Sequence, residues 1–380
     1  MIDETLALAR QEQAGIEAAR LKIGEYEWCE PDYRQILLWA KAMDLEPGEV
    51  IRRMLDKRSL HRDGNQYLLL PMGGDETKFA DGRIVQLNWD FSLLPLEKFE
   101  WVAGLEMTHL GFSETPQNTP CLALRLSSLL HLSVNCIALT ELDLSGVSSL
   151  TELRCGANAL TELDLSRVPM LTELWCLDNH LTELDLSGVP KLRSLWCGDN
   201  KLTELDLCGV PMLTELECAR NQLSELDLSC VPMLTNLGCC QNHLTELDLS
   251  GVPKLQRLMC RDNKLAELDL CDVPMLTWLK CAHNQLIELD LSCVPMLTNL
   301  YCCQNHLTDL DLLGVPRLAH LMCGDNKLTD LDLSGVPMLT WLKCAHNQLT
   351  KLDIRSLLNL RKLSFDFGVT RLIKHPDQHF

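Results

Sequence analysis

Apolar and polar residues follow a single pattern from Leu129 to Phe380, and this pattern returns every 21 residues. One copy, Leu171 to Lys191, reads LTELWCLDNHLTELDLSGVPK. Its apolar Leu171, Leu174 and Cys176 are spaced by three and two residues, which predicts a short strand with one face turned inward. Asparagine holds the same place in ten consecutive copies, at positions 158, 179, 200, 221, 242, 263, 284, 305, 326 and 347. Because one unit of this size cannot bury its apolar face alone, the repetition predicts a solenoid of twelve stacked units.

The first half of the copy, L-x-x-L-x-C-x-x-N-x-L from Leu171 to Leu181, resembles the leucine-rich-repeat signature. The second half, Leu181–Leu186, echoes the first, so the unit resembles the bacterial 21-residue class with nested half-repeats. This resemblance implies a leucine-rich-repeat solenoid. We expect a curved right-handed superhelix of short parallel β-strands, with β, 3-10 or irregular segments on its convex side and a small α-helical region before it.

Three repeated positions have predicted structural roles. Each asparagine side chain is expected to bond the backbone of its turn, because a buried amide needs partners. The aspartates from Asp164 to Asp353 are expected to accept turn N–H groups. Cysteine shares its position with Val134 in the first unit and Phe365 in the last, so it reads as a small core hydrophobe. The cysteines at this position are Cys155, Cys176, Cys197, Cys218, Cys239, Cys260, Cys281, Cys302, Cys323 and Cys344.

The chain before the repeats divides into two predicted parts. Residues 1–60 are expected to be helical, with helices at 4–22, 31–43 and within 45–55. Residues 61–128 are expected to form an N-terminal cap, with short strands from 66 and degenerate lead-in turns at 83–89 and 101–107, and a polar loop at 113–120. The array itself, 129–380, would include its own C-terminal cap. The first helices have a helix-turn-helix outline with basic Arg52 and Arg53, but acidic residues outnumber basic ones in residues 1–128.

The formal net charge of -19 argues against binding nucleic acid or an anionic membrane through bulk charge, and favours a protein partner. The opening Met1–Arg10 is acidic and has no apolar run, which argues against a signal peptide. No stretch is long and apolar enough for a membrane span. We therefore expect a cytoplasmic protein whose 19 cysteines are reduced thiols.

The strand positions on either side of the inward leucine vary from unit to unit, and in leucine-rich repeats these positions line the concave face. Here they combine aromatic, Met and charged residues, which is typical of a protein-binding surface. Acidic residues come early in the array and basic ones late. The predicted partner-binding residues are Glu173, Trp175, Trp196, Glu215, Glu217, Arg257, Met259, Trp278, Lys280, Tyr301, His320, Met322, Trp341 and Lys343.

Other candidates for chemistry are weaker. The Glu and Asp columns supply one carboxylate per turn, whereas calcium loops gather several, so we expect no metal and no cofactor. The outward Cys240 and Cys303, and the pairs Cys208/Cys230 and Cys271/Cys293 about one turn apart, are expected to be free thiols whose redox role is open. No catalytic motif is evident.

The first hypothesis is therefore a non-enzymatic scaffold or adaptor that binds one protein on its concave face, with a second contact through the N-terminal helices. One alternative is an acidic, cysteine-rich inhibitor or sensor that wraps a partner enzyme. A DNA-binding regulator acting through the N-terminal helices is a third. A second period of 63 residues, visible in His180, His243 and His306, groups the units into cassettes of three.

Overall fold

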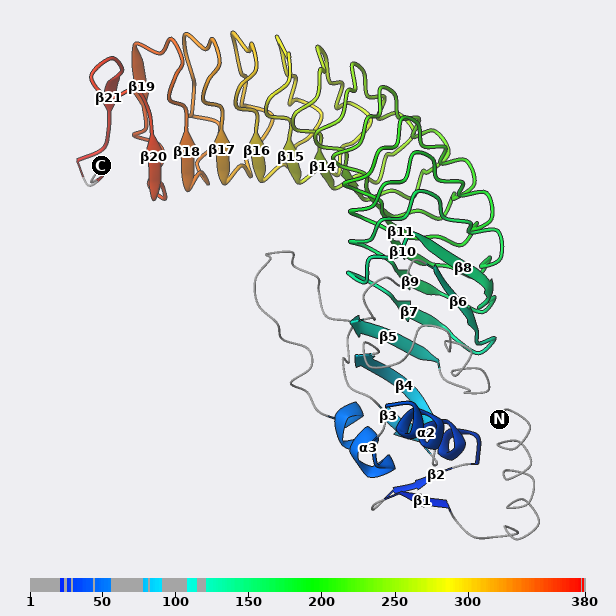
Figure 1. The fold of residues 1–380 in the computed structure, drawn as a ribbon. Coiled ribbons are helices and arrows are strands. Elements are labelled where there is room, and N and C mark those ends of the chain that lie inside the picture. The colour runs from blue at the N-terminus through cyan, green and yellow to red at the C-terminus, as the bar shows by residue number, and fades with distance from the viewer. Residues whose placement is uncertain are drawn as a thin grey trace.

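The computed structural model is a curved solenoid of short parallel strands that follows an N-terminal region, whose described residues include two helices (Figure 1). The structure describes residues 21–23, 26–28, 30–43, 45–55, 78–80, 83–90, 108–114, 121–376 and 378. The short strands line the inner side of the curve, and the second halves of the turns form its outer side (Figure 1). None of the helices in the described residues is long and apolar enough to cross a membrane.

Within the described residues, one sheet runs the length of the solenoid, from β20 at one end to β3 at the other. Neighbouring strands of the array pair in parallel with equivalent residues aligned, so that Leu174 lies beside Leu195. This register confirms the predicted stack of 21-residue units. The twelve strands are β7 (His131–Ser133), β9 (Glu152–Arg154), β10 (Glu173–Trp175), β11 (Ser194–Trp196), β12 (Glu215–Glu217), β13 (Asn236–Gly238), β14 (Arg257–Met259), β15 (Trp278–Lys280), β16 (Asn299–Tyr301), β17 (His320–Met322), β18 (Trp341–Lys343) and β20 (Lys362–Ser364).

The sheet continues before the first unit. Strand β4 (Arg83–Asp90) pairs in parallel with β5 (His109–Glu114), which pairs with β7, and β3 (Lys78–Ala80) pairs with β4 in the antiparallel sense. The predicted lead-in turn at 83–89 is confirmed. The predicted loop at 113–120 is wrong in its first two residues, which complete β5; residues 115–120, 66–71 and 101–107 lie outside the described part. Pairing of this end of β5 with β4 outweighs the local turn propensity of Ser113.

Two helices precede these strands. Helices α2 (Glu30–Met43) and α3 (Pro47–Leu55) confirm the predictions at 31–43 and within 45–55, and Trp39 and Val50 are buried. A hairpin of β1 (Leu21–Ile23) and β2 (Tyr26–Trp28) corrects the expectation of helix throughout residues 1–60. Its β-branched and aromatic residues favour strands. Most of the helix predicted at 4–22 lies outside the described residues, and its last two residues belong to β1.

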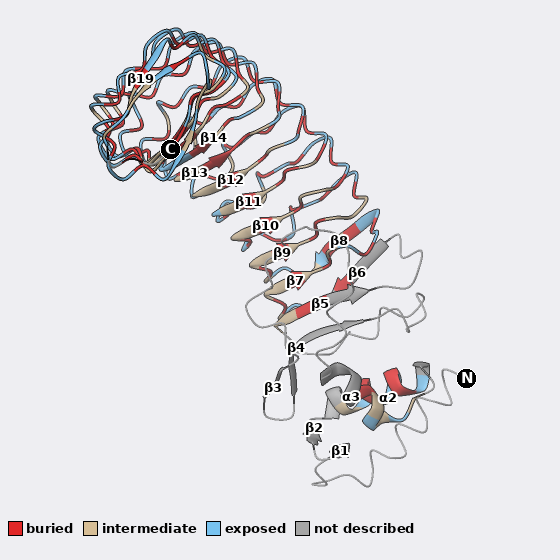
Figure 2. Ribbon diagram, turned by 90° about the vertical axis from the view of Figure 1, so that its left-hand side faces the viewer, coloured by how far each residue is buried: buried red, intermediate tan, exposed pale blue. Residues whose placement is uncertain are grey.

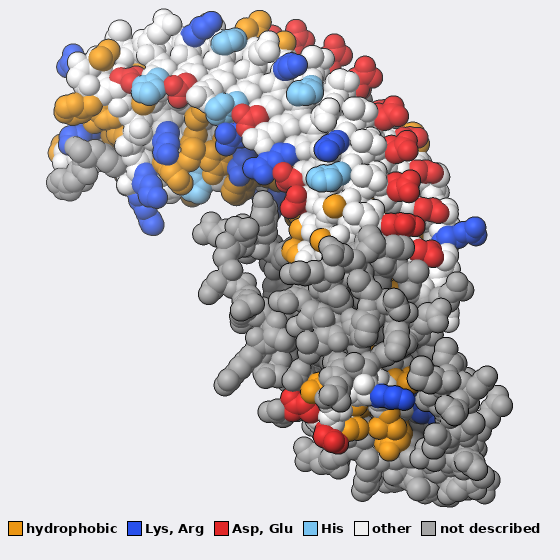
Figure 3. Space-filling model, in the orientation of Figure 1, with side chains coloured by type: hydrophobic (Ala, Val, Ile, Leu, Met, Phe, Trp, Pro, Cys, Tyr) orange, Lys and Arg blue, Asp and Glu red, His pale blue; other side chains and the backbone are white. Residues whose placement is uncertain are grey.

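The convex side is irregular over most of the array, as expected. At its two ends, β6 (Cys121–Arg125) pairs with β8 (Glu141–Gly146), and β19 (Lys351–Asp353) pairs with β21 (Arg371–Ile373). Between residues 155 and 340, which the structure describes throughout, the second half of each turn contains no strand. The exposed Glu column, for example Glu183 and Glu204, lies here, and acidic side chains follow the outer edge of the curve (Figure 3).

Buried residues recur at the same positions from turn to turn (Figure 2), and apolar side chains occupy most of these positions. In the opening copy, Leu171, Leu174, Cys176 and Leu181 all have 0% exposure. The predicted core position of the cysteine column is thereby confirmed. Burial raises the pKa of these thiols, to about 12 for Cys155 and Cys281.

The asparagine ladder joins consecutive turns. The Asn221 Nδ2 atom donates to the carbonyl oxygens of Cys197 and Cys218, both at 3.1 Å, and its Oδ1 accepts from the Leu202 N–H at 3.0 Å. One amide therefore bonds its own turn and the preceding one, as predicted. The residue before each ladder asparagine is left-handed, with φ of 54° at Asp178 and 56° at Arg220. This conformation turns the chain out of the strand.

The aspartate column has its predicted role in the turns. The Asp185 Oδ1 atom accepts from the Ser187 backbone N–H at 2.9 Å, and the same contact recurs at Asp227 and Ser229. These hydrogen bonds lower the pKa of both aspartates.

Candidate functional site

The array places two columns of variable side chains on its concave face. In each three-residue strand the middle leucine points into the core, so the residues on either side of it point outward. Most of these outward residues are half-buried, because neighbouring turns pack against their flanks. All fourteen predicted partner-binding residues occupy such positions, on strands β10 to β18.

A contiguous cluster occupies the N-terminal part of this face. The Arg154 guanidinium lies over the Trp175 ring, 4.8 Å from its centroid, and Trp175 stacks on Trp196 with centroids 4.6 Å apart. Arg154 also donates from Nε to Glu152 at 2.6 Å. Two contacts from His131 and Arg154 hold the Glu152 carboxylate, and the His131 hydrogen bond is the main cause of its lowered pKa. Of the residues in this N-terminal cluster, only Trp175 and Trp196 were among the predicted partner-binding residues.

The row of stacked side chains on the concave face extends further toward the N-terminus than the sequence suggested. The His131 ring stacks on His109 at 4.1 Å with 7° between the planes. Sequence reasoning missed both histidines because β5 was not predicted and β7 was treated as the edge of the array. The spacing of 22 residues between them, close to the repeat period, is the signal that would have found them.

In the middle of the face, an acidic side chain lies over a glycine. Gly238 has no side chain there, and the Glu217 carboxylate occupies the place where a Cβ of residue 238 would lie. The Ala219 N–H donates to Glu217 at 3.2 Å. Burial raises the pKa of Glu217, and this is the dominant cause of the shift. Nearby, Glu215 accepts from the Asn236 side chain at 3.2 Å.

A second cluster lies toward the C-terminus. The Lys280 ammonium lies 5.2 Å from the Trp278 ring centroid and 5.6 Å from that of Tyr301. Trp341 is flanked in the same way by Lys343 at 5.2 Å and Lys362 at 4.4 Å. Hydrophobic and basic side chains gather on the inner edge of this part of the solenoid (Figure 3).

Two further contacts complete this C-terminal cluster. His320 meets Trp341 edge to face at 5.8 Å and contacts the Asn299 amide. Met322 lies beside Tyr301 and Lys343 in the strand register.

The structure therefore divides the predicted residues into two groups. Trp175 and Trp196 belong to the N-terminal cluster, and Trp278, Lys280, Tyr301, His320, Met322, Trp341 and Lys343 belong to the C-terminal cluster. Glu173, Glu215, Glu217, Arg257 and Met259 lie in the same columns near or between these clusters. Strands β12, β13 and β14 separate Trp196 from Trp278, about 19 Å at the usual spacing of about 4.8 Å per strand.

Comparison with solved structures identifies the architecture. The functional domain of InlJ from Listeria monocytogenes, described as including a cysteine ladder, is 32% identical. It covers 76% of this chain, the chain covers 68% of it, and the TM-score is 0.65. The chain belongs to the leucine-rich-repeat family. No family model matches this chain, and no curated protein matches it by sequence.

Other leucine-rich-repeat structures share the fold. The Leptospira interrogans LRR protein LIC12759 is 23% identical over 76% of this chain and 78% of its own, with a TM-score of 0.65. The structure of an LRIM1/APL1C complex includes a chain that is 22% identical over 70% of this chain and 53% of its own, with a TM-score of 0.58.

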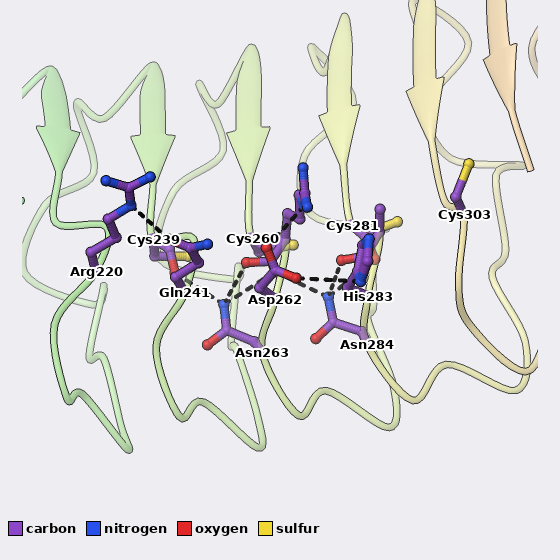
Figure 4. A network of polar contacts seen from close by, with 12 residues as sticks. Arg220, Cys239, Gln241, Cys260, Asp262, Asn263, Cys281, His283, Asn284 and Cys303 are labelled. Carbon is purple, nitrogen blue, oxygen red and sulfur yellow. Dashed lines mark hydrogen bonds and ion pairs between the residues drawn. The ribbon is translucent and has the colours of Figure 1, made fainter. Parts of the chain in front are cut away.

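The leucine-rich repeats also carry polar residues on the loops that follow the strands (Figure 4). The Arg220 Nε atom donates to Gln241 at 2.6 Å, and His283 approaches Asp262 at 3.4 Å. Beneath them, Asn263 and Asn284 continue the ladder (Figure 4). Cys303 is half-buried in this row, as is Cys240, and burial raises the pKa of both thiols.

One prediction about the outer cysteines is wrong. Cys208 and Cys230 form a disulfide, with Cα atoms 4.9 Å apart, where free thiols were expected. The pair had been judged able to approach, but the expected reducing environment weighed against a bond. Cys271 and Cys293 approach as expected and stay unbonded, with 2.6 Å between their sulfur atoms.

Sequence reasoning also missed an exposed apolar row beside the concave face. Its methionines follow the Val-Pro of six repeats, and their exposure ranges from 38% to 56%. In the turns that have a basic residue at this position, its side chain contacts the methionine of the preceding turn. For example, the Lys191 Nζ atom lies 3.2 Å from the Met170 Sδ atom. The period of 21 was the available signal. The exposed methionines are Met170, Met212, Met233, Met275, Met296 and Met338.

Proposed function

We propose that this leucine-rich-repeat protein is a non-enzymatic scaffold or adaptor that binds a protein partner on its concave face. The observation that carries the proposal is the C-terminal cluster, where Trp278, Tyr301 and Trp341 stand outward beside Lys280 and Lys343. Aromatic residues held by their neighbours lose little conformational freedom on binding. They therefore supply much of the energy of many protein interfaces.

Random change on a solvated face does not account for this composition. Such a face accumulates Lys, Glu and Ser, whereas large apolar residues on monomer surfaces are usually scattered. Here the rings recur in one column and contact one another across adjacent turns, as Trp278 and Tyr301 do at 5.7 Å. The ring faces carry cations, which favours a partner with carboxylates next to apolar side chains.

The charges on the face support a partner with two kinds of segment. Glu173, Glu215 and Glu217 lie on β10 and β12, before Lys280, Lys343 and Lys362, which lie on β15, β18 and β20 toward the C-terminal end. A partner that presents basic groups to the first set and acidic groups to the second would be steered into one orientation along the solenoid.

Affinity capture from the source organism tests the proposal. We would compare the wild-type chain with a Trp278→Ala/Trp341→Ala variant. Captured proteins would be identified by mass spectrometry, and their affinity for each variant measured by titration calorimetry. The matched control is Met275→Ala/Met338→Ala, because these exposed residues precede the two tryptophans by three positions in the same turns. Circular dichroism would check that each variant stays folded.

We expect the tryptophan variant to lose at least roughly tenfold in affinity for the captured protein, as central aromatic contacts do, and the methionine variant to bind like wild type. Loss of binding in the methionine variant alone would place the interface on the exposed methionine row. The second contact through α2 and α3, the absence of catalysis and the cytoplasmic location remain predictions.

A further inference from the structure

Two pairs of cysteines occupy equivalent places on the outer side of the solenoid, 63 residues apart. Cys208 and Cys230 form one pair, and Cys271 and Cys293 form the other. In each pair the first cysteine follows the aspartate of one turn by two positions. The second lies one position further along in the next turn. Both pairs therefore bridge neighbouring turns at the same point of the three-turn cassette.

The backbone geometry brings these two positions into contact. Where other turns have glycine at the second position, the neighbouring turn is close: a Cβ at Gly209 would lie 2.9 Å from the Ser187 Cα, and one at Gly251 2.8 Å from the Ser229 Cα. A side chain placed there must contact the residue 22 positions earlier. In the first pair this contact is a disulfide with a Cα separation of 4.9 Å, within the usual range for disulfides.

The second pair has the same arrangement with its thiols free. The Sγ atoms of Cys271 and Cys293 lie 2.6 Å apart. Cys271 is exposed and Cys293 half-buried, so a small reactant can reach them. In contrast, the core thiols Cys260 and Cys281 have 0% exposure. The second pair therefore combines proximity with access, and the buried column has only proximity.

We propose that Cys271 and Cys293 are a thiol–disulfide exchange site, which a low-molecular-weight disulfide such as oxidised glutathione converts into a second covalent link between adjacent turns. The inference is independent of the proposed binding function. It concerns the outer side of the solenoid, whereas the proposed interface lies on the inner side.

The exchange proceeds in two balanced steps. The Cys293 thiolate attacks one sulfur of oxidised glutathione, forming a mixed disulfide and releasing one glutathione thiolate, which takes up a proton. Cys271 keeps its proton until then, because its hydrogen bond to Cys293 raises its pKa to about 12. The Cys271 sulfur next attacks Cys293 and displaces the second glutathione, which takes the Cys271 proton. Two protein thiols are oxidised and one glutathione disulfide is reduced to two thiols.

The product would join the turn of β14 to the turn of β15. A link closing a loop of this size restricts the unfolded chain and suppresses local separation of the two turns. The existing Cys208–Cys230 bond joins the turns of β11 and β12 in the same way. Oxidation would thus lock two short segments of the array, one in each of two successive cassettes.

The test uses the full chain, fully reduced and then equilibrated with mixtures of reduced and oxidised glutathione. Unreacted thiols are alkylated in denaturant and mapped by mass spectrometry. We expect Cys271 and Cys293 to lose alkylation together, with a linked product about 2 Da lighter than the dithiol. Cys208 and Cys230 serve as the internal positive control, and Cys260 and Cys281 as the buried negative control.

Single variants assign the link. In Cys293→Ser, Cys271 should stay alkylatable or carry one glutathione, and no linked product should form. Hydrogen exchange of residues 257–259 and 278–280 should slow on oxidation of the wild-type chain and stay unchanged in Cys271→Ser/Cys293→Ser. The proposal is overturned if Cys271 and Cys293 remain alkylatable under conditions that link Cys208 to Cys230 completely, or if either links to another cysteine instead.

Discussion

The indole rings of Trp175 and Trp196 stack on the concave face with their centroids 4.6 Å apart and 4° between their planes. This separation matches the usual spacing of about 4.8 Å between adjacent strands. Because the two residues are aligned in the parallel register of β10 and β11, the repeat itself brings the rings together. A solenoid thus turns a sequence separation of 21 residues into direct side-chain contact.

This stacking predicts an energetic coupling. In a double-mutant cycle of Trp175→Ala and Trp196→Ala, we expect a coupling of about 0.5–1.5 kcal/mol in the free energy of unfolding, because aromatic pairs gain this much beyond their burial. The control cycle pairs Trp175→Ala with Trp341→Ala, which lie eight strands apart in the sheet, and should be additive. Chemical denaturation followed by circular dichroism measures both cycles. Additivity in the first cycle would contradict the prediction.

The asparagine ladder predicts a large loss on truncation. In Asn242→Ala the carbonyl oxygens of Cys218 and Cys239 and the Leu223 N–H lose their side-chain partner inside the solenoid. Buried polar groups left unpaired cost about 1–3 kcal/mol each, so we expect a destabilisation of roughly 3 kcal/mol or more.

The matched control for this prediction is Asn236→Ala in the same turn. Asn236 is half-buried on the concave face and its side chain donates to Glu215, so its loss should be much smaller. Urea denaturation of the two variants gives the comparison. Equal losses would show that the ladder bonds contribute little.

Glu217 predicts a pH-dependent stability. Its folded-state pKa is raised by burial above the ordinary value of 4.5. The protonated form is therefore favoured in the folded state, and this stabilisation is present below pH 4.5 and lost as the pH rises through the raised pKa. Glu217→Gln keeps an acceptor for the Ala219 N–H and removes the buried charge.

We accordingly expect Glu217→Gln to have a higher melting temperature than wild type at neutral pH, with the difference vanishing at acidic pH. Glu215→Gln, on the same strand, provides the control and should show no such gain. Calorimetry across this pH range measures both. A gain independent of pH would point to packing instead of charge.

The structure predicts a shifted pKa for His346, which lies on the loop that follows β18. Its Nδ1 atom lies 2.8 Å from Asp325 Oδ1, and this hydrogen bond is the main cause of a pKa raised above 6.5. The stabilisation from the charged pair is therefore present below pH 6.5 and is lost as the pH rises through the raised pKa. Nuclear magnetic resonance should show the His346 pKa falling in Asp325→Asn and unchanged in Asp309→Asn, an exposed control. An unchanged value in Asp325→Asn would remove Asp325 as the cause.

Much of the architecture was predictable because the same 21-residue pattern recurs along the array. Residues equivalent to Leu174, Cys176 and Asn179 recur along the array. Because the turns stack in register, each of these residues has the same buried position in its turn. The concave positions followed from the same period. The N-terminal residues were harder, because Leu21 and Ser113 belong to segments outside the regular repeat, where pairing with another strand outweighs local preference.

The sequence by itself determined the period, the inward and outward sides of each strand, the core role of the cysteine column and the bonding role of the asparagines, since these depend on local spacing repeated twelve times. Only the tertiary structure decided which outward residues touch. It stacked Trp175 on Trp196, laid Glu217 over Gly238, and joined Cys208 to Cys230 while leaving Cys271 and Cys293 unbonded. Those outcomes depend on ångström-scale separations between adjacent turns, which the residue pattern does not specify.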